Sequence, residues 1–200
     1  KDKIIYIVVD QPPPDLLELT KSESEKSRES KLILNGYKRD NYQRQMAHQA
    51  LEWITKDKLK LKGSSWTLDK TAKANVIIIH GLGEHHARYE HVARLFNSVG
   101  INVYAYDQRG HGLSDGKKGF SPTHQHLLDD LDVIKEYVLG QETIPLFMYG
   151  HSFGGNVLTS YLLKSQDSSI EGAIISSAWF KLAFEPPKFE VALGRFMNNI

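Results

Sequence analysis

The feature that most constrains the fold of this chain is the alternation of short apolar runs with helical patterns after residue 74. Asn75 to His80 is a continuous β-branched run, of the kind found in a strand buried on both faces. The helical stretch Tyr89 to Ser98 follows this run, and strands and helices then continue to alternate. The next predicted strands are Ile101 to Tyr106, Leu146 to Tyr149 and Gly172 to Ser176, and the helix Asn156 to Lys164 lies between the last two of them. Short connections between such elements predict an α/β domain, in which helices cover both faces of a mostly parallel sheet.

Two further elements can be predicted from local patterns. An amphipathic helix is indicated by apolar residues at helical spacing, with Ser121-Pro122 as its expected N-cap and first turn; these residues are Leu127, Leu128, Leu131, Ile134, Tyr137 and Val138. Upstream, Leu51 to Thr55 and Leu59 to Trp66 alternate apolar and polar residues around a short polar connection, which predicts a hairpin.

Residues 1–45 differ in composition from the rest of the chain. They contain the triple proline Pro12 to Pro14 and a polar stretch over residues 21–30 that offers little apolar surface to offset the entropy of ordering. Ile4 to Val9 has the composition of a strand, but no neighbouring segment offers an obvious partner. We therefore expect a polar extension or linker over 1–45, a domain core over 46–178, and the start of a cap insertion over 179–200.

The overall composition excludes several classes of function. The 25 Lys and Arg residues balance the 24 Asp and Glu residues, so no strong field would attract nucleic acid or an anionic membrane. The absence of cysteine excludes disulfides, thiolate nucleophiles and cysteine-ligated zinc. No apolar run approaches the roughly 20 residues that span a bilayer, and no signal peptide pattern is visible. A cytoplasmic or peripherally membrane-associated location is expected.

The stretch Gly150-His151-Ser152-Phe153-Gly154-Gly155 matches G-x-S-x-G at the end of an expected strand and the start of an expected helix. Such a turn exposes a serine in a strained conformation, and Gly150 and Gly154 allow the close approach of neighbouring backbones. The N–H of Phe153, at the helix start, would stabilise an oxyanion. We predict that Ser152 is a nucleophile; the alternative is a glycine-rich connection with an inert serine.

A second glycine-containing segment, His80-Gly81-Leu82-Gly83-Glu84-His85, follows the strand Asn75 to Ile79. In it Gly81 and Gly83 let the backbone turn its amides toward the serine, which makes the Leu82 N–H the candidate for a second oxyanion donor. A metal site is the alternative, with histidine ligands from His80, His85, His86 and His91. The chain has no metalloprotease motif, and this spacing does not supply a fixed tetrahedral ligand set.

The third segment runs from Tyr106 to Gly116 with the sequence YDQRGHGLSDG. Its glycines and alternating charges suit a tight, internally bonded loop. For Arg109 and His111 we favour a scaffolding role over direct catalysis.

HGLGEH, YDQRGHGLSDG and GHSFGG, in this order and after successive strands, resemble the monoacylglycerol lipase and lysophospholipase branch of the α/β hydrolases, also called the serine aminopeptidase S33-like domain. The resemblance covers about Leu51 to Ser177. It implies the α/β-hydrolase fold, no metal and no cofactor. It also implies that Ser152 is the nucleophile, that Phe153 and Leu82 supply the oxyanion amides, and that Glu84 and Arg88 support the loop.

The resemblance also implies that the triad acid and histidine lie after later strands, beyond Ile200. We therefore expect a chain truncated before the last strands of the fold, with a sheet that ends on an uncovered edge strand and poor ester hydrolysis by the 200-residue piece alone. His151 is not assigned as the base.

Aromatic residues are frequent between Trp179 and Ile200, and we interpret this segment as the start of an apolar lid that receives an acyl chain. Ordinary packing of the next helix is the alternative. The expected function is hydrolysis of a monoacylglycerol or lysophospholipid, a small lipid or ester substrate, with membrane contact through the lid. An acyltransferase or a catalytically silent hydrolase-fold binding protein would share the same motifs, and a peptidase is possible on family grounds alone.

Overall fold

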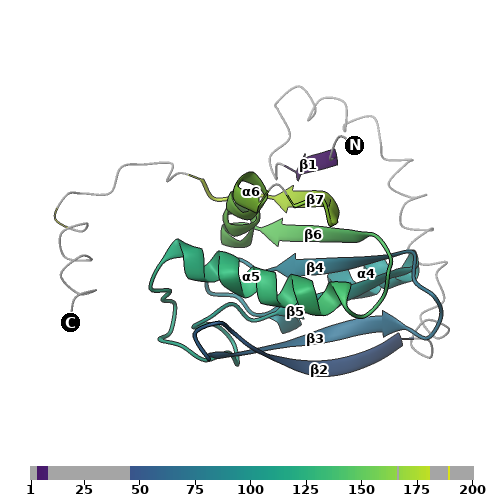
Figure 1. Ribbon diagram of the computed structural model, residues 1–200, viewed down its shortest axis with the longest axis horizontal. Helices are drawn as coiled ribbons and strands as arrows, with labels where there is room; N and C mark the ends of the chain where they lie inside the picture. Colours follow the sequence, from purple (N-terminus) through teal and green to yellow (C-terminus); the bar gives the residue numbers. More distant parts are fainter. Residues whose placement is uncertain (1–3, 9–45, 166, 181–188, 190–200) are drawn as a thin grey trace, which may run out of the picture.

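The computed structural model of the protein describes residues 4–8, 46–165, 167–180 and 189. These residues form one seven-stranded sheet with the order β1-β7-β6-β4-β5-β3-β2 (Figure 1). The strands are β1 (Ile4–Val8), β2 (Met46–Ile54), β3 (Lys60–Leu68), β4 (Ala74–Ile79), β5 (Ile101–Tyr106), β6 (Leu146–His151) and β7 (Ile170–Ser176). The helices are α4 (Glu90–Ser98), α5 (His124–Leu139) and α6 (Phe153–Ser165), with a short 3-10 helix η2 (His86–Tyr89) before α4.

The sheet is mostly parallel, as predicted. Strands β1, β7, β6, β4 and β5 run parallel to one another, while β2 and β3 form the predicted hairpin and β3 pairs antiparallel with β5. Because β4 lies between β6 and β5, the loops that follow these three strands meet at one edge of the sheet. This edge carries all three glycine-containing motifs.

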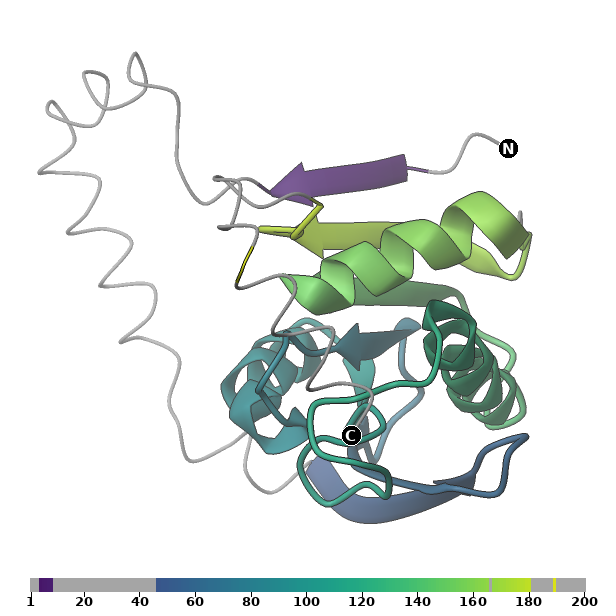
Figure 2. The same cartoon turned by 90° about the vertical axis from the view of Figure 1, so that its left-hand side faces the viewer.

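Strand β1 corrects one expectation. Ile4–Val8 does have a partner, because it pairs in parallel with β7 from Ile4 opposite Gly172 to Val8 opposite Ser176. Strand β1 is therefore one edge of the sheet, and residues 4–8, which lie within the expected polar extension, form part of it (Figure 2). The physical reason is that the free N–H and C=O groups of an edge strand pair with any extended segment that reaches them, however far it lies in the sequence.

Helices cover both faces of the sheet. In Figure 1, α5 and α6 lie in front of the sheet and α4 lies behind it. All six residues of β4 are buried, and they alternate between the two faces: Ile77 and Ile79 pack with residues of α5 and α6, whereas Val76 and Ile78 pack with Tyr89 and with α4. This double coverage explains why the sequence of β4 is a continuous apolar run.

The predicted N-cap of α5 is wrong by two residues. The N-cap is Thr123, which has an extended backbone and accepts a hydrogen bond from the His126 N–H through its side chain. Ser121 instead donates its hydroxyl to the Thr123 carbonyl oxygen at 2.8 Å, and Pro122 lies outside the helix. Thr123 takes the position because a cap needs a non-helical backbone and a side-chain oxygen within reach of the first free amides.

Over the part of the chain that the structure describes, no helix has the length and apolar character needed to span a bilayer.

Candidate active site

Ser152 occupies the sharp connection between β6 and α6. It has a positive φ of 52°, a strained value for a residue with a side chain, and this agrees with the predicted elbow. Hydrogen bonds hold the strained backbone from both sides. The Ser152 N–H donates to the Ser176 carbonyl at 2.9 Å, and the Ser152 carbonyl accepts from the N–H groups of Asn156 and Trp179 at 3.2 and 3.1 Å.

Two glycines make the elbow sterically possible, as predicted. A Cβ atom on Gly154 would lie 2.1 Å from the Ile79 carbonyl oxygen and 2.5 Å from that of His80. A Cβ atom on Gly150 would lie 2.6 Å from the Gly154 carbonyl oxygen. Each contact is with backbone, so any side chain at these positions would force α6 away from the sheet.

The loop after β4 lies directly against Ser152. A Cβ atom on Gly81 would be 3.2 Å from the Ser152 Cβ atom. The Glu84 carboxylate accepts hydrogen bonds from the Gly81 N–H at 2.9 Å and the Tyr89 hydroxyl at 2.7 Å, and it pairs with Arg88 at 3.3 Å. Burial acts to raise the pKa of Glu84, but these hydrogen bonds and the Arg88 charge bring it below its ordinary value. Glu84 and Arg88 therefore brace the loop.

The two candidate oxyanion amides, the N–H groups of Leu82 and Phe153, have no hydrogen-bond acceptor in the part of the chain that the structure describes. Gly83, the next residue in the loop, has a φ of 72°, which suits glycine. Leu82 exposes 52% of its surface. The assignment of these two amides to an oxyanion hole stays a prediction.

His80, the last residue before Gly81, is fully buried and uses both ring nitrogens. Nδ1 contacts the Gly81 carbonyl oxygen at 2.7 Å, and Nε2 accepts the backbone N–H of Gln108 at 3.0 Å. The Gln108 side chain in turn donates to the His80 carbonyl at 2.6 Å. Desolvation lowers the pKa of His80 to about 4, so the ring is neutral near pH 7. No role was predicted for Gln108, although it lies within the third motif, or for Tyr89, although it begins the predicted helix after the second motif.

The structure does not assemble the histidines of the alternative metal site. His80 uses both ring nitrogens as described, and His86 contacts Asp107 through Nδ1 and Ser64 through Nε2. Among the residues with described positions, no group of three His, Cys, Asp or Glu side chains is placed to hold a metal ion.

Ser64, His86 and Asp107 form a second serine–histidine–aspartate arrangement that the sequence did not reveal. The Ser64 hydroxyl lies 3.2 Å from His86 Nε2, and His86 Nδ1 lies 2.8 Å from the Asp107 carboxylate. Ser64, however, is only 4% exposed and lies within β3, where no ester carbonyl can reach it. The arrangement ties β3 to η2 and to the loop after β5, and its role is structural.

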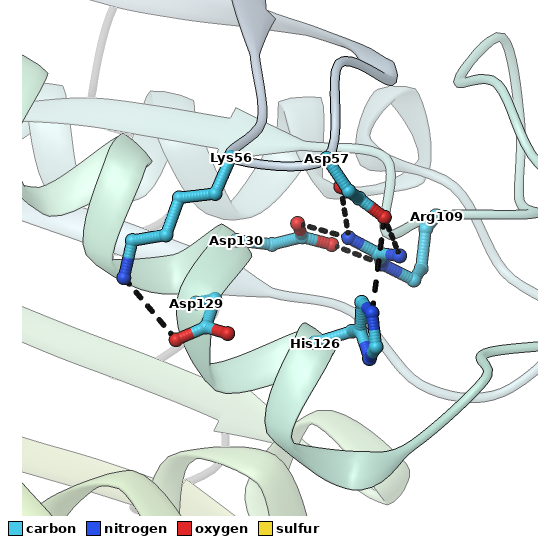
Figure 3. Close-up of a pocket in the computed structure, with 6 residues that line it drawn as sticks. All are labelled: Lys56, Asp57, Arg109, His126, Asp129 and Asp130. Carbon is cyan, nitrogen blue, oxygen red and sulfur yellow. Dashed lines mark hydrogen bonds and ion pairs between the residues drawn. The ribbon is translucent and has the colours of Figure 1, made fainter.

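Arg109 is buried and forms ion pairs with two carboxylates, those of Asp57 and of Asp130 (Figure 3). Its side chain is 1% exposed and donates to both oxygens of Asp130, each at 2.7 Å, and to Asp57 at 2.9 and 3.1 Å. Hydrogen bonds from Arg109 and Thr55 hold the pKa of Asp57 well below its usual range. These ion pairs border a cavity of about 180 Å³ lined by Lys56, Asp57, Arg109, His126, Asp129 and Asp130. These contacts support the predicted scaffolding role of Arg109.

His111 also has a supporting position. Its ring packs edge-on against His80 with centroids 5.3 Å apart, and its Nδ1 lies 3.0 Å from the Arg109 carbonyl oxygen. The loop after β5 therefore backs the loop after β4.

A pocket of about 220 Å³ opens beside the loop after β4 and the end of β6. Its lining comprises Glu84, Arg88, Tyr89, His91, Val92, Tyr149 and His151. The Nδ1 of His151 lies 3.3 Å from the Ser176 hydroxyl, and in the described part of the chain no histidine ring hydrogen-bonds the Ser152 side chain.

Three aromatic residues of the expected lid are described by the structure. Trp179 and Phe180 are 41% and 61% exposed, and the Trp179 ring lies 6.4 Å from that of Phe153. Phe189 is also exposed. Phe184 and Phe196, which are part of the same expectation, lie outside the described residues.

Comparison with known proteins adds independent findings. Residues 70–200 match the family model of serine aminopeptidase S33. The chain is 40% identical over 147 residues to an uncharacterized abhydrolase domain-containing protein of Dictyostelium discoideum, covering 74% of this chain and 16% of that protein. It is 36% identical over 97 residues to a monoacylglycerol lipase of Mycolicibacterium smegmatis, covering 48% of this chain and 35% of that enzyme. The chain thus spans about a third or less of these two relatives.

The solved structure of a lipase also matches the fold of this chain. A soluble variant of a Saccharomyces cerevisiae monoglyceride lipase, determined with a substrate analog, matches with a TM-score of 0.62 and 25% identity. The match covers 76% of this chain and 50% of that one.

Proposed function

The chain belongs to the serine aminopeptidase S33 family, in the monoacylglycerol lipase branch of the α/β hydrolases, and we propose that its protein cleaves carboxylic esters of lipids through an acyl-enzyme on Ser152. The observation that carries the proposal is the strained serine at the β6–α6 elbow, with the Gly81 backbone directly beside it. A serine in an ordinary loop would not need this strain, which positions the hydroxyl for attack.

The proposed reaction has two steps. The Ser152 hydroxyl gives its proton to a general base while its Oγ forms a new C–O bond to the ester carbonyl carbon, and the negative charge of the tetrahedral intermediate is stabilised by the Leu82 and Phe153 N–H groups. The intermediate collapses as the bond from the acyl carbon to the alcohol oxygen breaks, and the alcohol leaves with the proton from the base. Water then hydrolyses the acyl-serine, which releases the carboxylic acid and restores the Ser152 hydroxyl. We further propose that the triad acid and base come from parts of the protein outside the described residues, so that residues 1–200 alone hydrolyse esters poorly.

The substrate class is proposed to be a monoacylglycerol or a lysophospholipid. The M. smegmatis relative is named a monoacylglycerol lipase and the yeast neighbour a monoglyceride lipase. The exposed Trp179 and Phe180 supply apolar surface near the elbow for an acyl chain and for peripheral membrane contact. The Glu84–Arg88 ion pair and the side chain of Tyr89 line the neighbouring pocket and offer polar partners for a hydroxylated or zwitterionic head group.

The test uses the purified full-length protein, a fluorophosphonate probe, and monoacylglycerol and lysophosphatidylcholine as substrates. Ser152→Ala should abolish labelling and reduce turnover by about 10⁴-fold or more. Ser160→Ala, which changes another serine of α6, is the matched control and should behave like the unchanged protein. If Ser152→Ala were labelled to the same extent as the unchanged protein, the assignment of Ser152 as the nucleophile would be contradicted. Product analysis with an added alcohol separates hydrolysis from acyl transfer, and a protein that is never labelled would be a silent binding protein.

A further inference from the structure

We propose that His80 is a positioning residue that aims the Leu82 amide at the reacting oxygen, through one hydrogen bond from its Nδ1–H to the Gly81 carbonyl. The inference rests on the proposed function, because it assigns a task to a group beside the same nucleophile. His80 itself touches no substrate, since its side chain is completely buried.

The contacts of the ring determine its protonation state. A backbone N–H can only donate, so the Gln108 N–H requires a lone pair on His80 Nε2. A carbonyl oxygen can only accept, so the Gly81 oxygen at 2.7 Å requires a proton on His80 Nδ1. These two contacts select the same neutral tautomer. The Gln108 side-chain nitrogen also lies near Nδ1, but at 3.4 Å this is the longest contact of the ring, and the same nitrogen donates to the His80 carbonyl oxygen at 2.6 Å. Complete burial also favours the neutral ring.

The orientation of the Leu82 N–H follows from peptide geometry. The Gly81 carbonyl and the Leu82 N–H belong to one peptide unit, and none of the described peptide bonds is cis. In a trans peptide these two groups point in opposite directions. Fixing the carbonyl against His80 therefore turns the Leu82 N–H away from the buried ring. Gly81 lies against Ser152, so this amide is held next to the nucleophile.

The neighbouring contacts restrict the Gly81 backbone further. Its N–H donates to the Glu84 carboxylate at 2.9 Å, and its carbonyl also accepts the Glu84 N–H at 3.3 Å. His80 is in turn held by the backbone and side chain of Gln108 and by the ring of His111. The YDQRGHG segment thus acts on the oxyanion loop through His80, which gives this motif a task in the site.

Two variants separate positioning from simple packing. In His80→Asn, the amide nitrogen can occupy the place of Nδ1 and keep the donor to Gly81, but the acceptor for Gln108 is lost. In His80→Gln, the amide oxygen can occupy the place of Nε2 and keep that acceptor, but the donor to Gly81 is lost. Each variant loses one buried hydrogen bond, so the two should be destabilised to a similar extent.

The measured quantity is the rate of fluorophosphonate labelling of Ser152 in the full-length protein. We expect His80→Gln to label on the order of 100-fold more slowly than the unchanged protein, and His80→Asn to stay within about threefold, because losing one oxyanion donor has an effect of this size. Equal rates in the two folded variants would overturn the inference. If the unchanged protein is not labelled at all, the proposed function fails and the inference fails with it.

A second measurement needs no activity and covers the case in which a variant does not fold. Nitrogen-15 NMR of the histidine rings in the unchanged protein should show His80 with a protonated Nδ1 and an unprotonated Nε2 near pH 7. A protonated Nε2 would overturn the inference even if labelling is normal.

Discussion

The contact between α6 and β4 can be tested with a single methyl group. Gly154 lies in the first turn of α6, and in Gly154→Ala the new Cβ atom would have to retreat from 2.1 Å to at least 3.4 Å from the Ile79 carbonyl oxygen to reach ordinary contact. The obstacle is the backbone of a buried strand, which cannot rotate away as a side chain could. The start of α6 must therefore move by about 1 Å, within the range of distortions that overpacking produces.

The displacement has two measurable consequences. Overpacking of this kind should lower the free energy of unfolding by about 3 kcal/mol, the upper part of the usual range, because backbone must shift. Since Ser152 and Phe153 lie at the displaced end of α6, labelling of the serine should slow by about 100-fold, the cost of a 1 Å misplacement. Urea unfolding followed by circular dichroism gives the first quantity, and fluorophosphonate labelling gives the second.

Gly140→Ala is the matched control. Gly140 caps the C-terminus of α5 with an ordinary φ of −75°, and its new Cβ atom would meet nothing closer than 3.4 Å. We expect a change within about 0.5 kcal/mol and normal labelling. If Gly154→Ala were as stable and as reactive as this control, α6 could not contact β4 as described, and the account of the elbow would be refuted.

Two further predictions concern buried charge. Asp130→Ala leaves Arg109 buried without its main partner and should lower the free energy of unfolding by about 3–5 kcal/mol. Asp57→Ala removes a carboxylate that is 38% exposed and should lower it by no more than about 1 kcal/mol. Equal losses of stability for the two variants in urea unfolding would contradict the buried Arg109–Asp130 pair. Burial lowers the pKa of His80 from an ordinary 6.5 to about 4, so between these values the unfolded chain binds a proton that the folded chain lacks, and stability falls as the pH falls. This loss of stability should begin near pH 6.5 and approach a total on the order of 3 kcal/mol near pH 4, and it should be absent from His80→Asn. If the free energies of unfolding of the unchanged protein and of His80→Asn changed in parallel from pH 7 to 5, the contribution of His80 would be excluded.

The local elements and motifs were largely predictable from the sequence, because each depends on nearby residues. The apolar run of β4 indicated a strand buried on both faces, and GHSFGG indicated a strained turn with glycines at Gly150 and Gly154. The partner of Ile4–Val8 was not predictable in the same way, since a parallel pairing across more than 160 residues leaves no local pattern. The cap of α5 was misplaced because Ser121 and Thr123 carry equivalent hydroxyls, and only the backbone conformation separates them.

The order of the strands in the sheet explains why the site needs three motifs rather than one. The motifs follow β4, β5 and β6 in the sequence, but in the sheet β4 lies between β6 and β5. The loop after β4 therefore touches Ser152 through Gly81 on one side and Gln108 through His80 on the other. His80 connects these two contacts, because it is buried and bonds to both Gly81 and Gln108. A change in the loop after β5 should consequently reach Ser152 through His80, which no spacing of motifs along the sequence could reveal.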